Sequence, residues 1–241
     1  MRIYGMTDIG LVREENQDSF AITDFENGIF AVLCDGMGGH SSGKEAGELA
    51  CSVIMDKFKS QYSPNFSLSS VRNLMFSCVN AANSAVFAES VKNPAKAGMG
   101  TTCVTVFRRG SDVLVVNVGD SRAYLSTKEN IRQITDDHTV VRMLLENGEI
   151  SAEEAHMHPQ QSCLTMAVGV ERNISPDYFE VTVDKDDIVL MCSDGLTRYC
   201  TDNEIHDIIN CNSLESLPAL LIERANSHGG RDNITVVVFS E

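Results

Sequence analysis

Several aspartates stand beside glycine at the ends of apolar segments. The four are Asp35, Asp120, Asp194 and Asp232, and Asp18 stands at the start of another such segment. An apolar run bounded by turn residues is typical of a buried strand. Glycine lets the backbone approach a ligand closely, but Asp-Gly is equally typical of a hairpin turn. The pattern therefore predicts either ordinary strand-end turns or carboxylates directed at one ligand.

Carboxylates that converge need a cation, because they repel one another and lose hydration when buried. Ligand sets made only of oxygen select Mg²⁺ or Mn²⁺ over zinc, and the backbone carbonyl of Gly36 offers a further oxygen. Two such ions about 3.5–4 Å apart can share a water, lower its pKa and direct it at phosphorus. If the strand ends converge, we expect a two-metal phosphate-ester hydrolase.

Strands dominate the elements that must position these residues. The expected strands are residues 2–9, 19–23, 29–34, 102–107, 113–118, 121–125, 179–183, 188–192 and 234–239. Three-to-four spacing predicts helices at 46–58 and 68–86, and further helices are expected at 140–146, 203–209 and 217–225. Ser67 is expected to cap the second helix, and Asp137 is a candidate cap for the third. The helices are grouped rather than alternating with strands, which indicates an α+β fold with largely antiparallel sheets.

Composition limits the class of protein. The 241 residues carry a formal net charge of −15, which argues against nucleic acid and anionic membranes as partners. Charged residues at 13–15 exclude a secretory segment, and the apolar runs are too short to span a bilayer, so we expect a cytoplasmic protein. No Cys-x-x-Cys pair occurs, and Cys34, Cys103 and Cys192 fall in apolar strands, where reduced core cysteines are expected.

At this point the ordered motifs of the chain become recognisable. They are Arg-Glu-Glu-Asn-Gln-Asp at 13–18, Cys-Asp-Gly-Met-Gly-Gly-His at 34–40, Gly-Thr-Thr at 100–102, Val-Gly-Asp-Ser-Arg-Ala-Tyr at 118–124, Asp-His at 137–138, Leu-Thr-Met-Ala-Val-Gly at 164–169, Cys-Ser-Asp-Gly-Leu at 192–196 and Gly-Arg-Asp-Asn-Ile-Thr at 230–235. In this order the chain resembles the metal-dependent protein phosphatases of type 2C (the PPM family), in their compact bacterial form. Each motif alone is weak, but the ordered set is specific and spans almost the whole chain.

The resemblance implies a single catalytic domain over residues 1–241. Its fold would be two antiparallel β-sheets packed face to face as a sandwich, with a helix pair on each outer face and a flap subdomain around residues 140–175. A centre of two Mn²⁺ or Mg²⁺ ions would lie at one end of the sandwich. By position, Asp35 would bridge the ions, the Gly36 carbonyl would bind one, and Asp194 and Asp232 would bind the other.

Further roles are implied by position in the same motifs. Asp120, with Asp194, matches the third and weaker metal site of bacterial members. Asp18 and Asn233 would support the ligands, Asp18 by holding a water on the metal.

Two side chains would act on the substrate. Arg13 matches the arginine that binds phosphate, for which its planar guanidinium is suited; the alternative is a solvated loop arginine. His40 matches the histidine proposed as general acid for the leaving alkoxide; the alternative is a flexible loop histidine.

The activity implied is hydrolysis of phosphoserine and phosphothreonine in proteins, by direct attack of the water between the two ions. Substrates would include a serine/threonine kinase, and a monomer is expected. The main alternative is a pseudophosphatase of the same fold that binds phosphoproteins without turnover. A two-metal phosphodiesterase or nuclease is a second, against which the net charge counts. The chain departs from the family at Gln161, Ser162 and Met166, which puts substrate contacts near the flap in doubt.

Overall fold

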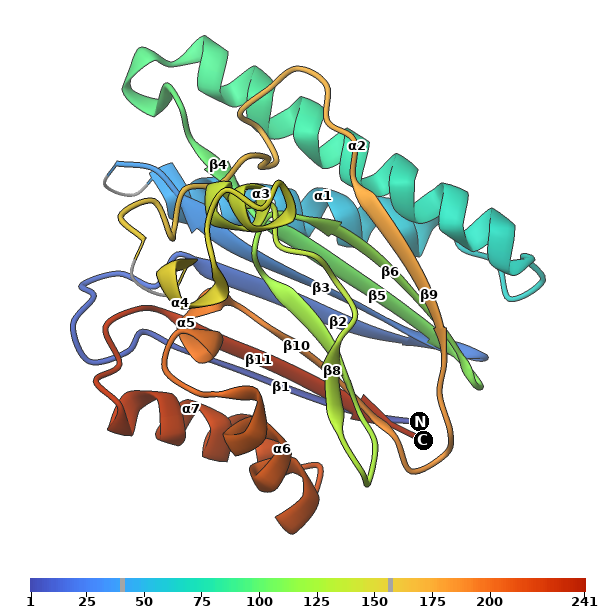
Figure 1. The fold of residues 1–241 in the computed structure, drawn as a ribbon. Coiled ribbons are helices and arrows are strands. Elements are labelled where there is room, and N and C mark those ends of the chain that lie inside the picture. The colour runs from blue at the N-terminus through green and yellow to red at the C-terminus, as the bar shows by residue number, and fades with distance from the viewer. Residues whose placement is uncertain (40–41, 156–157) are drawn as a thin grey trace.

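The computed structural model describes residues 1–39, 42–155 and 158–241. Within these ranges the strands form two antiparallel sheets that pack face to face, and helices cover the outer face of each sheet (Figure 1). The predicted α+β sandwich is therefore confirmed. None of the helices in this described part is long and apolar enough to cross a membrane.

The first sheet joins the two ends of the chain. Its strands, in spatial order, are β1 (Arg2–Asp8), β11 (Ile234–Ser240), β10 (Ile188–Cys192), β7 (Arg122–Ser126) and β8 (Ile131–Gln133). Because β1 pairs antiparallel with β11 along its whole length, both termini lie at the same end of the sandwich (Figure 1).

The second sheet carries Asp18 and Asp35 on two neighbouring strands. Its strands, in spatial order, are β2 (Asp18–Phe25), β3 (Gly28–Met37), β5 (Cys103–Arg109), β6 (Asp112–Val118) and β9 (Asp177–Thr182), and the short β4 (Gly100–Thr101) pairs with the end of β3. Alternate residues of β3 face opposite ways: Phe30 and Val32 pack under the helices, whereas Ala31 and Leu33 pack against the other sheet. Burial on both faces explains why this strand is a continuous apolar run.

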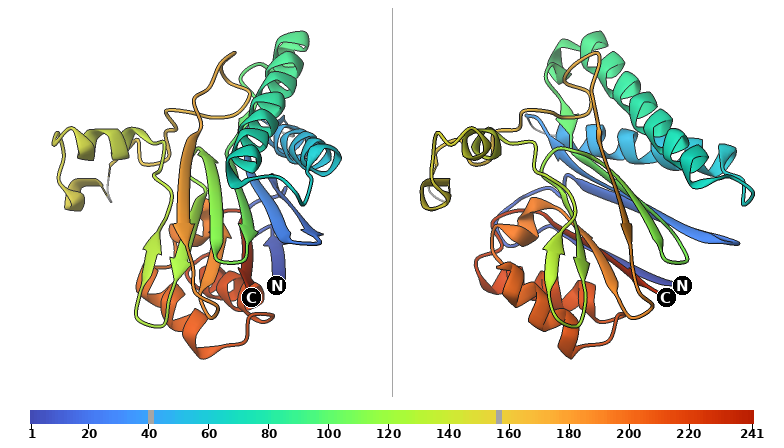
Figure 2. Two further views of the ribbon diagram at one scale, coloured as in Figure 1. Left: turned by 90° about the vertical axis from the view of Figure 1, so that its right-hand side faces the viewer. Right: turned by 45° about the vertical axis from the view of Figure 1, so that its right-hand side comes forward.

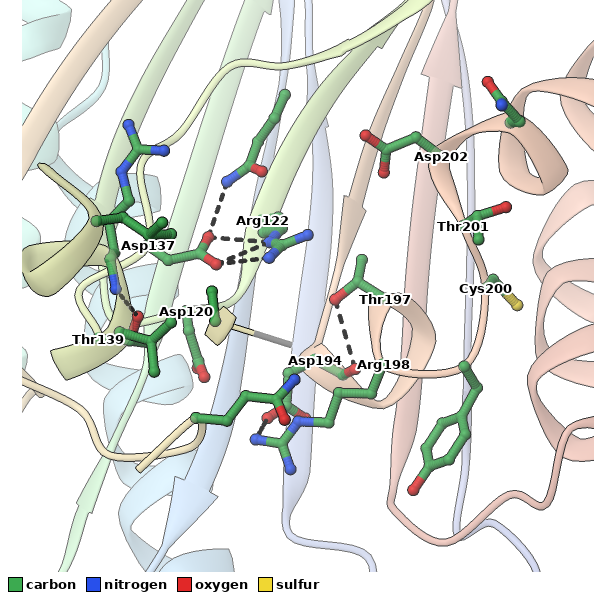
Figure 3. A pocket seen from close by; sticks show the side chains of 18 residues that line it. Asp120, Arg122, Asp137, Thr139, Asp194, Thr197, Arg198, Cys200, Thr201 and Asp202 are labelled. Atoms are coloured by element: carbon green, nitrogen blue, oxygen red, sulfur yellow. Dashed lines mark hydrogen bonds and ion pairs between the residues drawn. The ribbon is translucent and has the colours of Figure 1, made fainter. Parts of the chain in front are cut away.

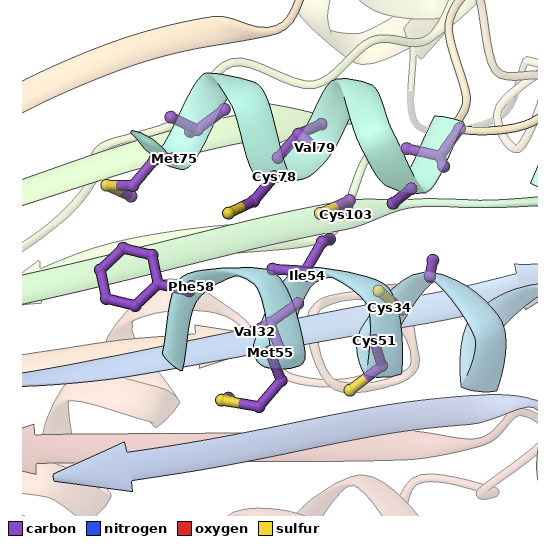
Figure 4. Packing of buried hydrophobic residues seen from close by; sticks show 14 of the residues in the cluster. Val32, Cys34, Cys51, Ile54, Met55, Phe58, Met75, Cys78, Val79 and Cys103 are labelled. Carbon is purple, nitrogen blue, oxygen red and sulfur yellow. The ribbon is translucent and has the colours of Figure 1, made fainter. Parts of the chain in front are cut away.

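Two long helices cover the second sheet, namely α1 (Ser42–Gln61) and α2 (Leu68–Lys92). The Ser67 hydroxyl accepts a hydrogen bond from the backbone N–H of Ser70, so the predicted cap of α2 is confirmed. Figure 4 shows Ile54 and Phe58 of α1 and Met75 of α2 directed at the same apolar layer. A short 3-10 helix, η1 (Pro94–Lys96), follows α2.

The remaining helices lie on the first sheet or at the end of the sandwich. On the sheet are α6 (Asp202–Cys211) and α7 (Leu217–Ser227), and at the end of β10 is the short α5 (Asp194–Thr197). The flap contains α3 (Val140–Glu146) and α4 (Ala152–Ala155), which project from the sandwich (Figure 2).

The predicted cap of α3 is wrong. Thr139, not Asp137, caps this helix through a hydrogen bond from the backbone N–H of Arg142. The Asp137 carboxylate instead forms an ion pair with Arg122 at 2.6 Å, because a charged partner on β7 binds it more strongly than a helix end.

Candidate metal centre

Aspartates that are far apart in the sequence meet at one end of the sandwich. They are Asp18 and Asp35 on β2 and β3, Asp120 after β6, Asp194 at the start of α5 and Asp232 before β11. All of them except Asp18 line one cavity of about 510 Å³, which Arg13 and Gly36 also line. The structure thus brings together every residue for which the sequence predicts metal binding.

The backbone of Asp35 is held on both sides. Its N–H donates to the Thr102 hydroxyl at 2.9 Å, and its carbonyl accepts from the Thr102 N–H and the Thr101 hydroxyl, each at 2.9 Å. The next residue, Gly36, lies so close to α1 that a Cβ there would be 2.0 Å from the Gly43 carbonyl oxygen. Only glycine permits this approach, which fixes where the Asp35 carboxylate enters the cavity.

Asp18 lies behind the cavity and is buried. Its Oδ2 accepts hydrogen bonds from the Ser193 and Thr235 hydroxyls, both at 2.7 Å. Its Oδ1 is also buried and has no hydrogen-bond partner in the described protein. An unpartnered buried carboxylate oxygen is costly, so this atom fits a site in which a cation and its water complete the structure.

Asp120 is positioned by the preceding turn. Gly119 has a φ of +102°, and its N–H donates to His138 Nδ1 at 3.0 Å. The second ring nitrogen of His138 lies 3.1 Å from the Asp177 carboxylate. His138 therefore supports the turn that presents Asp120.

Asn233 holds the loop that carries Arg13 next to Asp232. Its Oδ1 accepts from the Gln17 N–H at 2.9 Å, and its Nδ2 donates to the carbonyls of Ile9 and Glu15, each at 3.0 Å. One side chain thus holds both ends of this loop beside Asp232, the residue that precedes it.

Burial and mutual repulsion raise the pKa of several of these carboxylates. Burial and the negative charges of Asp18 and Asp194 raise the pKa of Asp35 well above its usual range. Burial raises the pKa of Asp18, and likewise that of Asp120, to about 7. For Asp194, burial raises the pKa and the Arg198 guanidinium opposes the rise. A divalent cation among these groups would favour their charged forms and relieve the repulsion.

Two of the carboxylates face guanidinium groups. Arg13 Nη2 lies 2.8 and 2.9 Å from the two Asp232 oxygens. Arg198, which caps the C-terminal end of α5 one turn beyond Asp194, forms an ion pair with it (Figure 3). In this arrangement, no three His, Cys, Asp or Glu side chains of the described residues are close enough together to ligate one ion.

Some of the site could not be identified from the sequence. His40 and Ser41 lie outside the described residues, so the histidine expected as general acid is not placed. The hydroxyls of Thr102, Ser193 and Thr235 belong to recognised motifs, but their partners become visible only once the two sheets are paired. Arg198 has no signal until α5 is known to be helical, which places it one turn from Asp194.

Comparisons with known proteins agree with this geometry. The family model described as protein phosphatase 2C matches residues 12–231. The serine/threonine phosphatase stp of Listeria welshimeri is 36% identical over 234 residues, which cover 96% of this chain and 92% of the relative. The crystal structure of serine/threonine phosphatase Stp1 from Staphylococcus aureus superposes with a TM-score of 0.93 at 32% identity, covering 99% of this chain and 94% of that one. The catalytic domain of serine/threonine protein phosphatase PstP, solved with two manganese ions, gives a TM-score of 0.83 at 32% identity, covering 98% and 96%.

Proposed function

The chain belongs to the protein phosphatase 2C family, and we propose that the cavity at its strand ends is the metal centre of the enzyme. The protein is a metal-dependent serine/threonine protein phosphatase that acts on phosphoproteins. The pseudophosphatase alternative has no support, because every aspartate that the sequence assigns to the metal is present in or beside the cavity.

The ligand assignment is the one that the family resemblance implies. Asp35, the Gly36 carbonyl, Asp194 and Asp232 would hold the two ions. Asp120, which is buried and lies in the same cavity as Asp194, would hold a third and weaker ion with it. A set made only of oxygen ligands suits Mn²⁺ and Mg²⁺, and the two manganese ions in the PstP structure make Mn²⁺ the first ion to test.

When bound, the two cations supply a nucleophile from water and neutralise charge on the phosphoryl group. The residues of the chain bind and orient the substrate around this centre. The Arg13 guanidinium, 51% exposed at the cavity and paired with Asp232 in this structure, would donate to the phosphate oxygens. Asp18 contributes one unpartnered oxygen as a hydrogen-bond acceptor. His40 keeps its proposed role as general acid, which rests on the sequence alone.

The substrates, the location and the oligomeric state of the enzyme are also proposed. We place a serine/threonine kinase among the phosphoprotein substrates and the enzyme in the cytoplasm as a monomer. The net charge of −15 disfavours nucleic acid and anionic membrane surfaces as partners. One catalytic domain accounts for the described residues, because both sheets contribute aspartates to the same cavity.

The convergence of the aspartates on one cavity carries the assignment, and Asp194 offers the sharpest test. We expect Asp194→Ala to abolish Mn²⁺-dependent hydrolysis of p-nitrophenyl phosphate and of a phosphothreonine peptide, because ligands of one centre act as a unit. The control is Asp186→Ala, which removes a solvent-exposed carboxylate paired with Lys128. EDTA should silence the wild type, and added Mn²⁺ should restore it. Turnover by Asp194→Ala close to that of the control would refute the assignment.

A further inference from the structure

Arg198 occupies an unusual position for a surface arginine. It is the C-cap residue of α5, one turn beyond Asp194, and its Nη2 forms an ion pair with Asp194 Oδ2. Its Nη1 lies 3.8 Å from Asp232 Oδ2. A single guanidinium therefore reaches two carboxylates that come from different strand ends, as Figure 3 shows for Asp194.

The negative charge of the cavity explains why the Arg198 guanidinium is held beside Asp194. The Asp194 side chain is only 13% exposed, and the charges of neighbouring carboxylates disfavour its ionised form. Arg198 is a permanent cation at any physiological pH, so it supplies positive charge to this carboxylate without a metal. The Arg198 side chain is 30% exposed, so it can move away from Asp194 without a rearrangement of the fold.

We propose that Arg198 is an internal counter-cation that competes with a divalent ion for Asp194 and so sets the affinity of the ion held by Asp194 and Asp232. The proposal rests on the proposed function, because it takes these two carboxylates as metal ligands. A divalent ion and a guanidinium on the same carboxylate repel each other, so that loading the ion must weaken or break the Arg198 ion pair.

The structure provides a place for the displaced side chain. Arg198 lines two cavities, the metal-site cavity and a larger one of about 620 Å³ between α5, α6 and the flap. The larger cavity is also lined by Asp202 (Figure 3). The larger cavity therefore gives a displaced guanidinium space and a second carboxylate in its lining.

The test measures Mn²⁺ binding directly, by isothermal titration calorimetry on metal-free protein. Arg198→Gln should bind Mn²⁺ about three- to tenfold more tightly than wild type, the range expected for loss of a partly exposed competing ion pair. Its metal-free form should also melt about 1–3 °C lower, because Asp194 has lost its partner. Equal or weaker Mn²⁺ binding by Arg198→Gln would overturn the proposal.

The matched control is Arg142→Gln. Arg142 lines the same larger cavity and carries the same charge, but it pairs with Asp136 and Glu146, which are not metal ligands. This variant should change the Mn²⁺ affinity by less than about twofold, which excludes a general effect of net charge. A gain equal to that of Arg198→Gln would show such a general effect and would also overturn the proposal.

Two further variants keep the outcomes distinct. Asp194→Asn should lose this Mn²⁺ site. If Asp194→Asn binds Mn²⁺ as wild type does, the metal-site assignment itself is wrong. If Asp194→Asn loses Mn²⁺ binding and the Mn²⁺ affinity of Arg198→Gln equals that of wild type, only the role of Arg198 is refuted. If Arg198→Gln does not fold, Arg198→Lys provides the measurement. It keeps a positive charge at this position, so its Mn²⁺ affinity should stay below that of an Arg198→Met variant, which removes the charge and should bind Mn²⁺ more tightly than wild type.

Discussion

Replacing Gly195 with alanine should separate two of the proposed metal ligands. Gly195 follows Asp194 at the start of α5, and a Cβ there would lie 1.9 Å from the Asn233 carbonyl oxygen. The contact is with backbone rather than with a flexible side chain, so rotation of a side chain cannot relieve it. The segment that begins α5 must therefore move away from the segment that carries Asp232.

The size of the effect follows from this overlap. Real Cβ contacts are essentially never closer than 3.0 Å, so the two segments must move apart by about 1 Å. Overpacking of this kind costs about 1–3 kcal/mol in the free energy of unfolding, or a fall in Tm of about 3–10 °C for a domain of this size. A displacement of about 1 Å at reacting groups can reduce the rate about 100-fold, and metal ligands tolerate only about 0.2 Å.

Three measurements on Gly195→Ala check this reasoning: Tm without metal, Mn²⁺ affinity by calorimetry, and kcat for p-nitrophenyl phosphate. The control is Gly39→Ala, because an added Cβ at this exposed position meets no atom of the described residues within 4 Å. We expect the control to keep its Tm and Mn²⁺ affinity, and the variant to lose about tenfold or more in affinity. If Gly195→Ala melts and binds Mn²⁺ as the control does, the close contact of α5 with residue 233 does not position the ligands.

Two more predictions follow from the site. Metal-free protein should bind Mn²⁺ more weakly as pH falls from 8 to 6, because the pKa values of Asp18 and Asp120 are raised to about 7 and bound protons must leave. The same carboxylates titrate near 3.9 in the unfolded chain, so the folded state holds more protons between pH 4 and 7. The Tm of the metal-free protein should therefore fall as pH rises from 5.5 to 7.5. A Tm that rises over this range would contradict the prediction. Arg13→Lys should lower kcat/KM for a phosphopeptide about 10–100-fold through the loss of bidentate phosphate binding, and steady-state kinetics with unchanged kcat/KM would remove Arg13 from the phosphate site.

Most of the fold was predictable because burial leaves a regular pattern. The run at 29–34 became the core of β3, and the three-to-four spacing at 46–58 and 68–86 became α1 and α2. The short elements could not be predicted, because they show no such pattern. β8 (Ile131–Gln133) and α5 (Asp194–Thr197) contain too few residues to establish a period. The Asp137 cap failed because its ion pair with Arg122 joins two segments, which local sequence does not reveal.

In the site, the candidate ligands could be predicted from the sequence, whereas the contacts that support them could not. Aspartate beside glycine at strand ends marks candidate ligands, and the family resemblance put them in order. The supporting contacts are not local: Asp18 accepts from Ser193 and Thr235, 175 and 217 residues further along the chain. Arg198 is one turn from Asp194, yet its role depends on a helix of four residues that has no periodic signal.

These supporting contacts link metal binding to the stability of the fold. Asp18 belongs to one sheet, and the hydroxyls that it accepts from follow β10 and lie on β11 of the other, so one buried carboxylate joins the two sheets at the end where the cavity lies. Its raised pKa and its unpartnered Oδ1 both mark a cost that the metal-free fold bears there. A cation that binds the folded state alone adds stability by mass action, about 2.7 kcal/mol at a concentration 100 times its Kd. The aspartates that would carry catalysis are therefore also the groups through which metal loading would stabilise the junction of the two sheets.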